Sequence, residues 1–221
     1  MNIILIGANN PETARMIKAV KKSNRNINFL GFIDNDPKKK GKKFLDLPVF
    51  GGFEVAEKYI KKGNFFVNLI TRDCITRFET SLAISKMGGK FTNLIHPSIN
   101  LEMVEIGVGN YIQEGVIIQT DVSIKNNSSI HMGSLIGHES TIGNSVFIAH
   151  GCNISGLVRI EDGAFVGTGV TIIPRLTVGH FSFIGAGTVI IRDVPPYSVV
   201  VGNPGRIIKK VATDYKGGNI I

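Results

Sequence analysis

The sequence predicts a small α/β domain followed by a parallel β-solenoid, and two observations lead to this fold class. Every sixth residue from Ile106 to Ile190 is isoleucine or valine, without exception. A helix repeats near 3.6 residues and an ordinary strand near 2, so a period of six requires a backbone that turns the same corner every six residues. Upstream of this array, strand-like and helix-like segments alternate, which is typical of a parallel sheet.

Residues 1–98 are expected to form a Rossmann-like domain. Its first strand ends at Gly7, and the amphipathic segment that follows carries the apolar residues Ala14, Ile17 and Val20. Because ligands of such sheets bind at the carboxyl ends of the strands, the turn after the first strand is the expected site. The other predicted elements are strands at 27–33 and 65–71 and a helix near 75–87.

The turn after the first strand lacks the fingerprint of a dinucleotide site. In the pattern G-x-G-x-x-G the second glycine lets the backbone approach a pyrophosphate, and Asn9 stands at that position after Gly7. The turn therefore disfavours an NAD-dependent dehydrogenase. Asp34 follows the second strand and offers an acceptor for a base or a ribose.

Residues 99–206 are expected to form the solenoid. Three hexads per coil give a triangular prism, and fifteen hexads give about five coils. The residue two places before each inward position is small or aliphatic, as at Ser134 and Cys152, and such residues can share a narrow interior. Residues 207–221 are expected to form a C-terminal tail.

Polar residues that the repeat does not need mark the expected site of chemistry. His138 and Glu139 lie at a corner between Ile136 and Ile142, so His138 should project outward. An imidazole titrates near neutral pH and can take the proton from an amine or hydroxyl that attacks a thioester. A solvated corner histidine without a function is the alternative interpretation of the same spacing.

Positive charge is concentrated in the first half of the chain. Residues 1–98 carry 17 Lys and Arg against 8 Asp and Glu, whereas residues 99–221 carry 8 against 9. The densest run, at 38–43, fits a solvated loop, a contact with a diphosphate-bearing ligand or a contact with an acidic membrane surface. Nucleic acid is disfavoured as a partner because no aromatic platform is interleaved with the lysines.

The remaining composition predicts a cytoplasmic protein without stable membrane insertion. No apolar run approaches the roughly 18 residues of a membrane span, and the chain begins with a strand-like segment rather than a signal peptide. The two cysteines, Cys74 and Cys152, lie in different halves of the chain. Neither a disulfide framework nor a zinc site is therefore predicted.

Three features resemble a known family: the hexad array, the segment 136–143 and the ending Val-Gly-Asn-Pro-Gly-Arg at 201–206. They are similar to the sugar O/N-acyltransferases of the PglD and sialic acid O-acetyltransferase type, which are hexapeptide-repeat transferases. The resemblance is strong for 106–206 and loose for 1–98. It implies a left-handed β-helix, acetyl-CoA as co-substrate without a metal, a sugar or nucleotide-sugar acceptor, and a homotrimer with its site between adjacent subunits.

The resemblance also implies roles for individual residues of the solenoid. His138 would be the general base of a direct acetyl transfer, and Glu139 would fix the tautomer of its ring. The backbone N–H of Gly156, which lies 18 residues after His138, would face the developing oxyanion. Thr168 and Ala186 would lie beside the pantetheine arm of the coenzyme.

Two departures from the family pattern concern ligand contacts. The family often has a histidine nine residues after the base, where this chain has Phe147, so either His150 replaces that contact or the contact is lost. By hexad arithmetic His138 and His150 lie on different corners, and His150 could assist only across a subunit interface. The family's Gly-Ala-Gly-Gly-His loop is also altered and lacks its histidine. The residues expected to bind the acceptor are Gly7, Asn9, Asp34, Asn35 and Thr71.

Two other classes of function were compared with acetyl transfer. A non-catalytic β-solenoid that serves as a scaffold or binding module would need neither the His-Glu pair nor the Asn-Pro-Gly-Arg ending. A carbonic-anhydrase-like solenoid would need three histidines that converge on a metal, and the spacing of the histidines does not match that pattern. His131 and His180 are expected to be surface residues.

Overall fold

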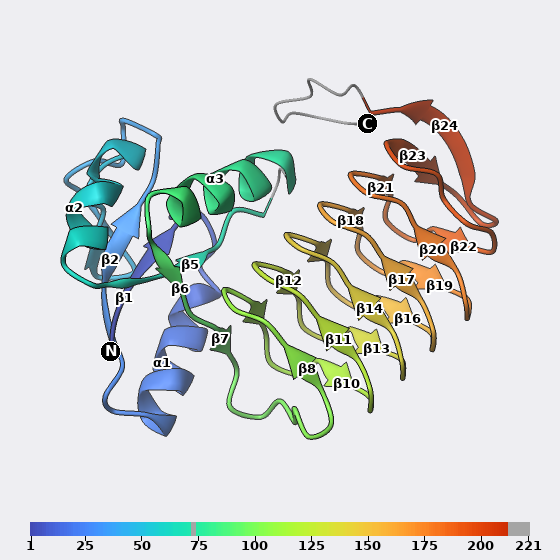
Figure 1. Ribbon diagram of the computed structural model, residues 1–221, viewed down its shortest axis with the longest axis horizontal. Helices are drawn as coiled ribbons and strands as arrows, with labels where there is room; N and C mark the ends of the chain where they lie inside the picture. The colour runs from blue at the N-terminus through green and yellow to red at the C-terminus, as the bar shows by residue number, and fades with distance from the viewer. Residues whose placement is uncertain (72–73, 212–221) are drawn as a thin grey trace.

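The computed structural model describes residues 1–71 and 74–211, and it joins a small parallel sheet to a three-sided β-solenoid (Figure 1). The N-terminal unit lies beside the first coils of the solenoid, and helix α3 (Cys74–Lys86) extends from it toward the middle coils. The tail predicted at 207–221 lies outside the described residues from residue 212 onward.

The N-terminal unit is built on a four-stranded parallel sheet in the order β2-β1-β5-β6. Strand β1, in the interior of this sheet, is an apolar run whose side chains are buried on both faces, as Ile4 and Leu5 show. The expected strands and helices are all present, whereas a hairpin, a short helix and the edge strand were not predicted. The bounds are β1 Asn2–Ile6, α1 Thr13–Ser23, β2 Asn28–Ile33, β3 Lys43–Phe44, β4 Leu47–Pro48, η1 Phe53–Val55, α2 Ala56–Lys61, β5 Phe65–Asn68 and β6 Lys90–Phe91.

The solenoid consists of three parallel sheets that form the faces of a prism. The first contains β10 Ile117–Ile118, β13 Leu135–Ile136, β16 Asn153–Ile154, β19 Thr171–Ile172 and β22 Val189–Ile190. The second contains β8 Glu105–Ile106, β11 Ser123–Ile124, β14 Thr141–Ile142, β17 Arg159–Ile160 and β20 Thr177–Val178. The third contains β7 Leu94–Ile95, β9 Tyr111–Ile112, β12 Ser129–Ile130, β15 Phe147–Ile148, β18 Phe165–Val166, β21 Phe183–Ile184, β23 Ser198–Val201 and, antiparallel at its end, β24 Arg206–Lys210.

Up to the last coil, each inward isoleucine or valine pairs with the residue 18 positions further along, as Ile136 does with Ile154, whereas Ile184 pairs with Val200. This register confirms the predicted prism of three hexads per coil. The small residues of the interior also close hydrogen bonds between coils: the Ser134 hydroxyl donates to the Ala149 carbonyl at 2.8 Å and accepts from the Cys152 N–H at 3.2 Å. Cys152 is fully buried, as predicted.

The two units share a packed and hydrogen-bonded interface. Leu94 and Tyr111, from the first strands of the solenoid, belong to the core of the N-terminal unit. Arg77 of α3 is fully buried and donates from Nε to the Asn127 carbonyl at 2.7 Å and from Nη1 to the Ile70 carbonyl at 2.7 Å. Burial lowers the pKa of Arg77 to about 10, so the guanidinium stays charged at neutral pH. This buried cation ties α3 to the segment after β5 and to the corner before β12.

Among the described residues, no helix combines the length and apolar character that crossing a membrane requires.

Truncation of an inward residue in the middle coils should destabilise the solenoid. Ile154 is fully buried, whereas Ile117 on the same sheet is 59% exposed. We expect Ile154→Ala to lower the free energy of unfolding by about 2–5 kcal/mol, since the coils above and below hold the cavity open. The matched variant Ile117→Ala should change it by less than about 0.5 kcal/mol. Urea titrations followed by circular dichroism measure both, and equal losses would contradict the inward assignment.

Candidate functional site

The His138–Glu139 pair lies at the corner between β13 and β14 and faces outward. The His138 side chain is 52% exposed, and its Nδ1 lies 2.9 Å from Oε2 of Glu139. Glu139 has a left-handed backbone with φ of 57°, which turns its side chain back toward the ring. The corner itself is fixed from the previous coil, because the His138 N–H donates to Oε1 of Gln119 at 2.9 Å. The free ring nitrogen, Nε2, is left for a ligand.

Gly156 lies directly against the ring of His138, one coil further along. A Cβ built at Gly156 would lie 2.6 Å from Nε2 of His138, so a larger residue at 156 would displace the imidazole from its present position. The His138 carbonyl accepts from the Leu157 N–H at 2.8 Å, which locks the two coils together. Within the described residues the Gly156 N–H donates to no acceptor. A backbone N–H without a protein acceptor and the free Nε2 therefore lie on neighbouring coils of one corner.

The residues predicted to contact the coenzyme lie on a different corner. His150, Thr168 and Ala186 form a column after β15, β18 and β21, in which each residue lies one coil from the next. Coil-to-coil bonds hold the column, since the Gly169 N–H donates to the His150 carbonyl and the Gly187 N–H to the Thr168 carbonyl. A whole face of the prism, the sheet that contains β13 and β16, separates this column from His138. One copy of the chain does not bring the two sets together.

The residues predicted to bind the acceptor lie at the carboxyl edge of the small sheet. Gly7 and Asn9 follow β1, Asp34 and Asn35 follow β2, and Thr71 follows β5. Asp34 is only 8% exposed and already has three protein donors: the Ala8 N–H, the Asp36 N–H and Nζ of Lys39. The Asn35 side chain accepts from the Phe53 N–H. Both side chains therefore shape the loops at this edge.

Lys39 is a site residue that the sequence did not single out from its run of lysines. Its Nζ lies 2.8 Å from Oδ2 of Asp34 and also contacts Oδ1 of Asn9. Its side chain is 27% exposed, so this member of the run is not a freely solvated lysine. The spacing of the loop after β2 does not distinguish Lys39 from Lys38 or Lys40, so the sequence offered no signal for it.

The expectation that His131 is a surface residue is wrong. It is 2% exposed and packs among the rings of Tyr111, Phe147 and His150, with ring centroids 5.9, 4.7 and 4.9 Å away. Burial, assisted by the nearby His150 and Arg77, lowers the pKa of His131 to about 3, so the ring is neutral at pH 7. The hexad rule places His131 outward, and the N-terminal unit then covers that face. His180 is partly exposed, as expected.

Apart from the contact between His131 and His150, the histidines of the solenoid do not converge within one chain. His138, His150 and His180 follow β13, β15 and β20 and so occupy three different corners. Among residues 1–71 and 74–211, no group of three or more His, Cys, Asp or Glu side chains is arranged to hold a metal ion.

The fold was compared with solved structures. PerB from Caulobacter crescentus, solved with CoA and GDP-perosamine, is 24% identical with a TM-score of 0.84, covering 95% of this chain and 98% of PerB. The acetyltransferase domain of PglB from Neisseria gonorrhoeae is 23% identical with a TM-score of 0.82, covering 94% and 99%. WeeI from Acinetobacter baumannii is 22% identical with a TM-score of 0.78, covering 94% and 100%. The chain therefore has the left-handed β-helix fold of the hexapeptide-repeat sugar acetyltransferases.

A curated relative also matches by sequence. Serine acetyltransferase from Buchnera aphidicola is 32% identical over 172 residues, which is 75% of this chain. The chain spans 56% of the length of that relative. No protein-family model matches the chain.

The ion pair of Asp34 should make the N-terminal unit sensitive to acid. Burial alone would raise the pKa of Asp34, but hydrogen bonds from Lys39, Ala8 and Asp36 outweigh it and hold the pKa below its usual value. A lowered pKa stabilises the fold above the unfolded-state value of about 4, and this stabilisation is lost as the pH falls through the folded-state value. We expect Asp34→Asn to lower the melting temperature at pH 7, with a gap from wild type that closes below about pH 4.

Asp46→Asn is the matched control for this acid sensitivity. Asp46 lies in the exposed turn between β3 and β4, so its substitution removes one negative charge without touching the loops at the sheet edge. Thermal melts of the three proteins from pH 3 to 8 measure the gap. A gap for Asp34→Asn that is unchanged at pH 3, or is matched by Asp46→Asn, would contradict the role of the ion pair.

Proposed function

We propose that the protein is an acetyl-CoA-dependent acetyltransferase whose acceptor is an amino or hydroxyl group of a sugar. The observation that carries the proposal is the His138–Glu139 pair, whose free ring nitrogen lies over Gly156. Two findings support it: the curated relative is a serine acetyltransferase, and the structures of similar fold are sugar acetyltransferases, one of them solved with acetyl coenzyme A.

The pair suits direct transfer from a thioester. As the acceptor nitrogen or oxygen forms its bond to the thioester carbonyl carbon, Nε2 of His138 takes the proton that the acceptor loses. Glu139 holds the Nδ1 proton and stabilises the imidazolium. The Gly156 N–H donates to the carbonyl oxygen as negative charge develops there. The C–S bond then breaks, and the proton on His138 returns to the leaving thiolate.

The N-terminal unit is proposed to hold the nucleotide of a nucleotide-linked acceptor in the manner of a Rossmann-like domain. The carboxyl edge of its parallel sheet is where such ligands bind, and Asn9, Asp34 and Lys39 meet at that edge. The excess of positive charge in 1–98 favours an anionic ligand there. PerB, of similar fold, was solved with GDP-perosamine, which supports this class of acceptor.

We also propose a cytoplasmic location and a homotrimer, and the same arrangement supports the trimer. The coenzyme column of His150, Thr168 and Ala186 lies one face away from His138 within a chain. In a cyclic assembly the His138 corner of one copy meets the coenzyme column of the next, and the site is completed between them. The alternative function, a non-catalytic scaffold, requires neither the glycine beneath His138 nor the carboxylate on its ring.

Removal of the base should abolish most of the activity. With wild-type protein we expect thiol release from acetyl-CoA in the presence of an amino sugar linked to UDP, GDP or dTDP, or of a sialic acid. His138→Asn should lower turnover about 10²-fold or more with CoA affinity unchanged, and Glu139→Gln should have a milder effect. His96→Asn, which changes an exposed histidine outside the site, is the control. Wild-type turnover in the His138 variant would refute the mechanism.

The assembly is tested by mass. Light scattering of the intact protein under assay conditions should return about three times the chain mass of 23.9 kDa. Because the proposed site needs two copies, dilution that dissociates the trimer should lower activity in parallel. A protein that is a monomer and fully active would contradict the shared site.

A further inference from the structure

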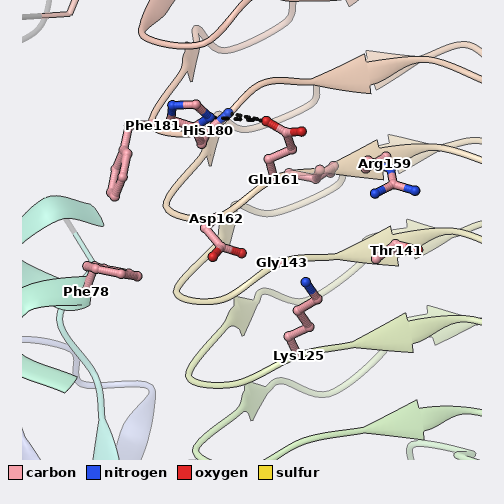
Figure 2. A pocket seen from close by; sticks show the side chains of 10 residues that line it. Phe78, Lys125, Thr141, Gly143, Arg159, Glu161, Asp162, His180 and Phe181 are labelled. Carbon is pink, nitrogen blue, oxygen red and sulfur yellow. Dashed lines mark hydrogen bonds and ion pairs between the residues drawn. The ribbon is translucent and has the colours of Figure 1, made fainter. Parts of the chain in front are cut away.

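A groove lies on the corner of the prism away from both His138 and the coenzyme column. It has a volume of about 370 Å³ and runs between α3 and the corner where the sheet of β14, β17 and β20 turns into the sheet of β15, β18 and β21 (Figure 2). The N-terminal unit contributes Phe78 to its wall, and the solenoid contributes the rest. The proposed acetyl transfer uses none of these residues.

One side of the groove is cationic. Lys125 and Arg159 line it, with the Thr141 side chain from the same sheet beside them. Both cations are exposed, and neither forms an ion pair with another residue of the described chain. An arginine in an open groove offers the paired N–H donors that fit a carboxylate.

Between these cations and α3 the same corner of the solenoid presents hydrogen-bond acceptors that the fold holds in place. Oε2 of Glu161 accepts the His180 N–H at 2.9 Å and lies 3.3 Å from Nδ1 of its ring. Asp162 accepts from the backbone and side-chain nitrogens of Asn144 at 2.7 and 3.1 Å. Each of these carboxylates has lone pairs that can accept from the hydroxyl groups of a ligand. Their negative charge would repel an anionic group of the ligand at this end of the groove.

Two aromatic rings close the end of the groove nearest α3. Phe78 and Phe181 meet edge to face with centroids 5.5 Å apart, and Phe181 stacks on Tyr197 at 5.7 Å. Figure 2 shows Phe78 on the helix and Phe181 on the solenoid, facing one another beside the carboxylates. Rings fixed in this way offer a rigid apolar surface for the C–H groups of a ligand.

His180 repeats the position of His138 but not its chemical setting. His138 follows Ile-Gly and His180 follows Val-Gly, each at a corner of the prism. The backbone N–H of each histidine donates to a side-chain oxygen 19 residues earlier in the chain. At His180, however, the next coil brings the ring of Tyr197 to 4.9 Å, and the place that Gly156 takes at the His138 corner is taken by Pro196, which has no N–H. No open backbone donor faces this ring, so the site suits binding rather than transfer.

The geometry points to a second ligand site in this groove, one that binds an acidic sugar. The sugar carboxylate would pair with Arg159 and Lys125, its hydroxyls would donate to Glu161 and Asp162, and its C–H face would pack on Phe78 and Phe181. A small carboxylate without hydroxyls would lack the hydrogen bonds to Glu161 and Asp162. A neutral sugar would lack the ion pairs with Arg159 and Lys125.

Calorimetry on the intact protein tests this site with glucuronate as the probe. We expect glucuronate to bind at least tenfold more tightly than glucose or acetate. Arg159→Gln should weaken glucuronate binding about tenfold or more, because it removes a charge-assisted contact. Phe78→Leu should weaken glucuronate and leave acetate unchanged. Arg25→Gln, at an exposed arginine just after α1, is the matched control and should bind as wild type does.

The outcomes separate this site from the acetyl-transfer site. Arg159 is exposed, so its variant should fold, and it should retain wild-type thiol release with a nucleotide-linked acceptor. If glucuronate binds no more tightly than glucose and acetate, or binds Arg159→Gln as it binds wild type, the acidic-sugar site is wrong. Binding that is lost in His138→Asn but kept in Arg159→Gln would assign the sugar to the transfer site and also overturn the inference.

Discussion

The stacking of inward isoleucine and valine side chains at an interval of 18 residues determines where every other side chain of the solenoid lies. Because Ile118, Ile136, Ile154, Ile172 and Ile190 pair in one register, the residues that follow them form straight columns at the corner. Apolar burial supplies the stability, and the ladder hydrogen bonds supply the register. A slip of one residue would turn the inward column to solvent, so the columns are rigid features of the fold. His138 and Gly156 meet because they belong to one such column.

The sequence predicted what depends on this period and failed where tertiary contacts override it. The prism, the outward His138, its glycine one coil later and the buried Cys152 all follow from counting in sixes. His131 obeys the same count and points outward, yet it is buried because the N-terminal unit covers that face of the prism. Periodicity within the repeat contains no information about a unit that precedes it. The small elements between β2 and β5 escaped prediction because elements of two to six residues are too short to show a period.

Buried polar groups at the unit interface are satisfied only in part, since Nη2 of Arg77 and Nδ1 of His131 have no hydrogen-bond partner within the described residues. Arg77 is fully buried, and two carbonyl oxygens accept from it, one from each unit. Loss of either hydrogen bond would leave a buried charged donor of Arg77 without an acceptor. The free-energy cost of that unpaired donor exceeds the net free energy that the hydrogen bond contributes. His131 meets the same constraint by staying neutral, since burial depresses its pKa. These groups fix the angle between the sheet edge that carries Asp34 and the prism that carries the columns.

The three corners of the prism thus have different chemical settings, although one backbone pattern generates them all. The His138 corner offers a basic nitrogen and an open N–H, the His150 corner offers a column of small and polar side chains, and the His180 corner offers a groove closed by α3. At the last of these corners the N-terminal unit of the same chain adds Phe78 to the wall of the groove. The first two lie at opposite edges of one exposed face, and such edges meet when identical prisms pack side by side. The division of residues among corners therefore favours a transfer site shared between copies and a separate groove that each chain forms alone.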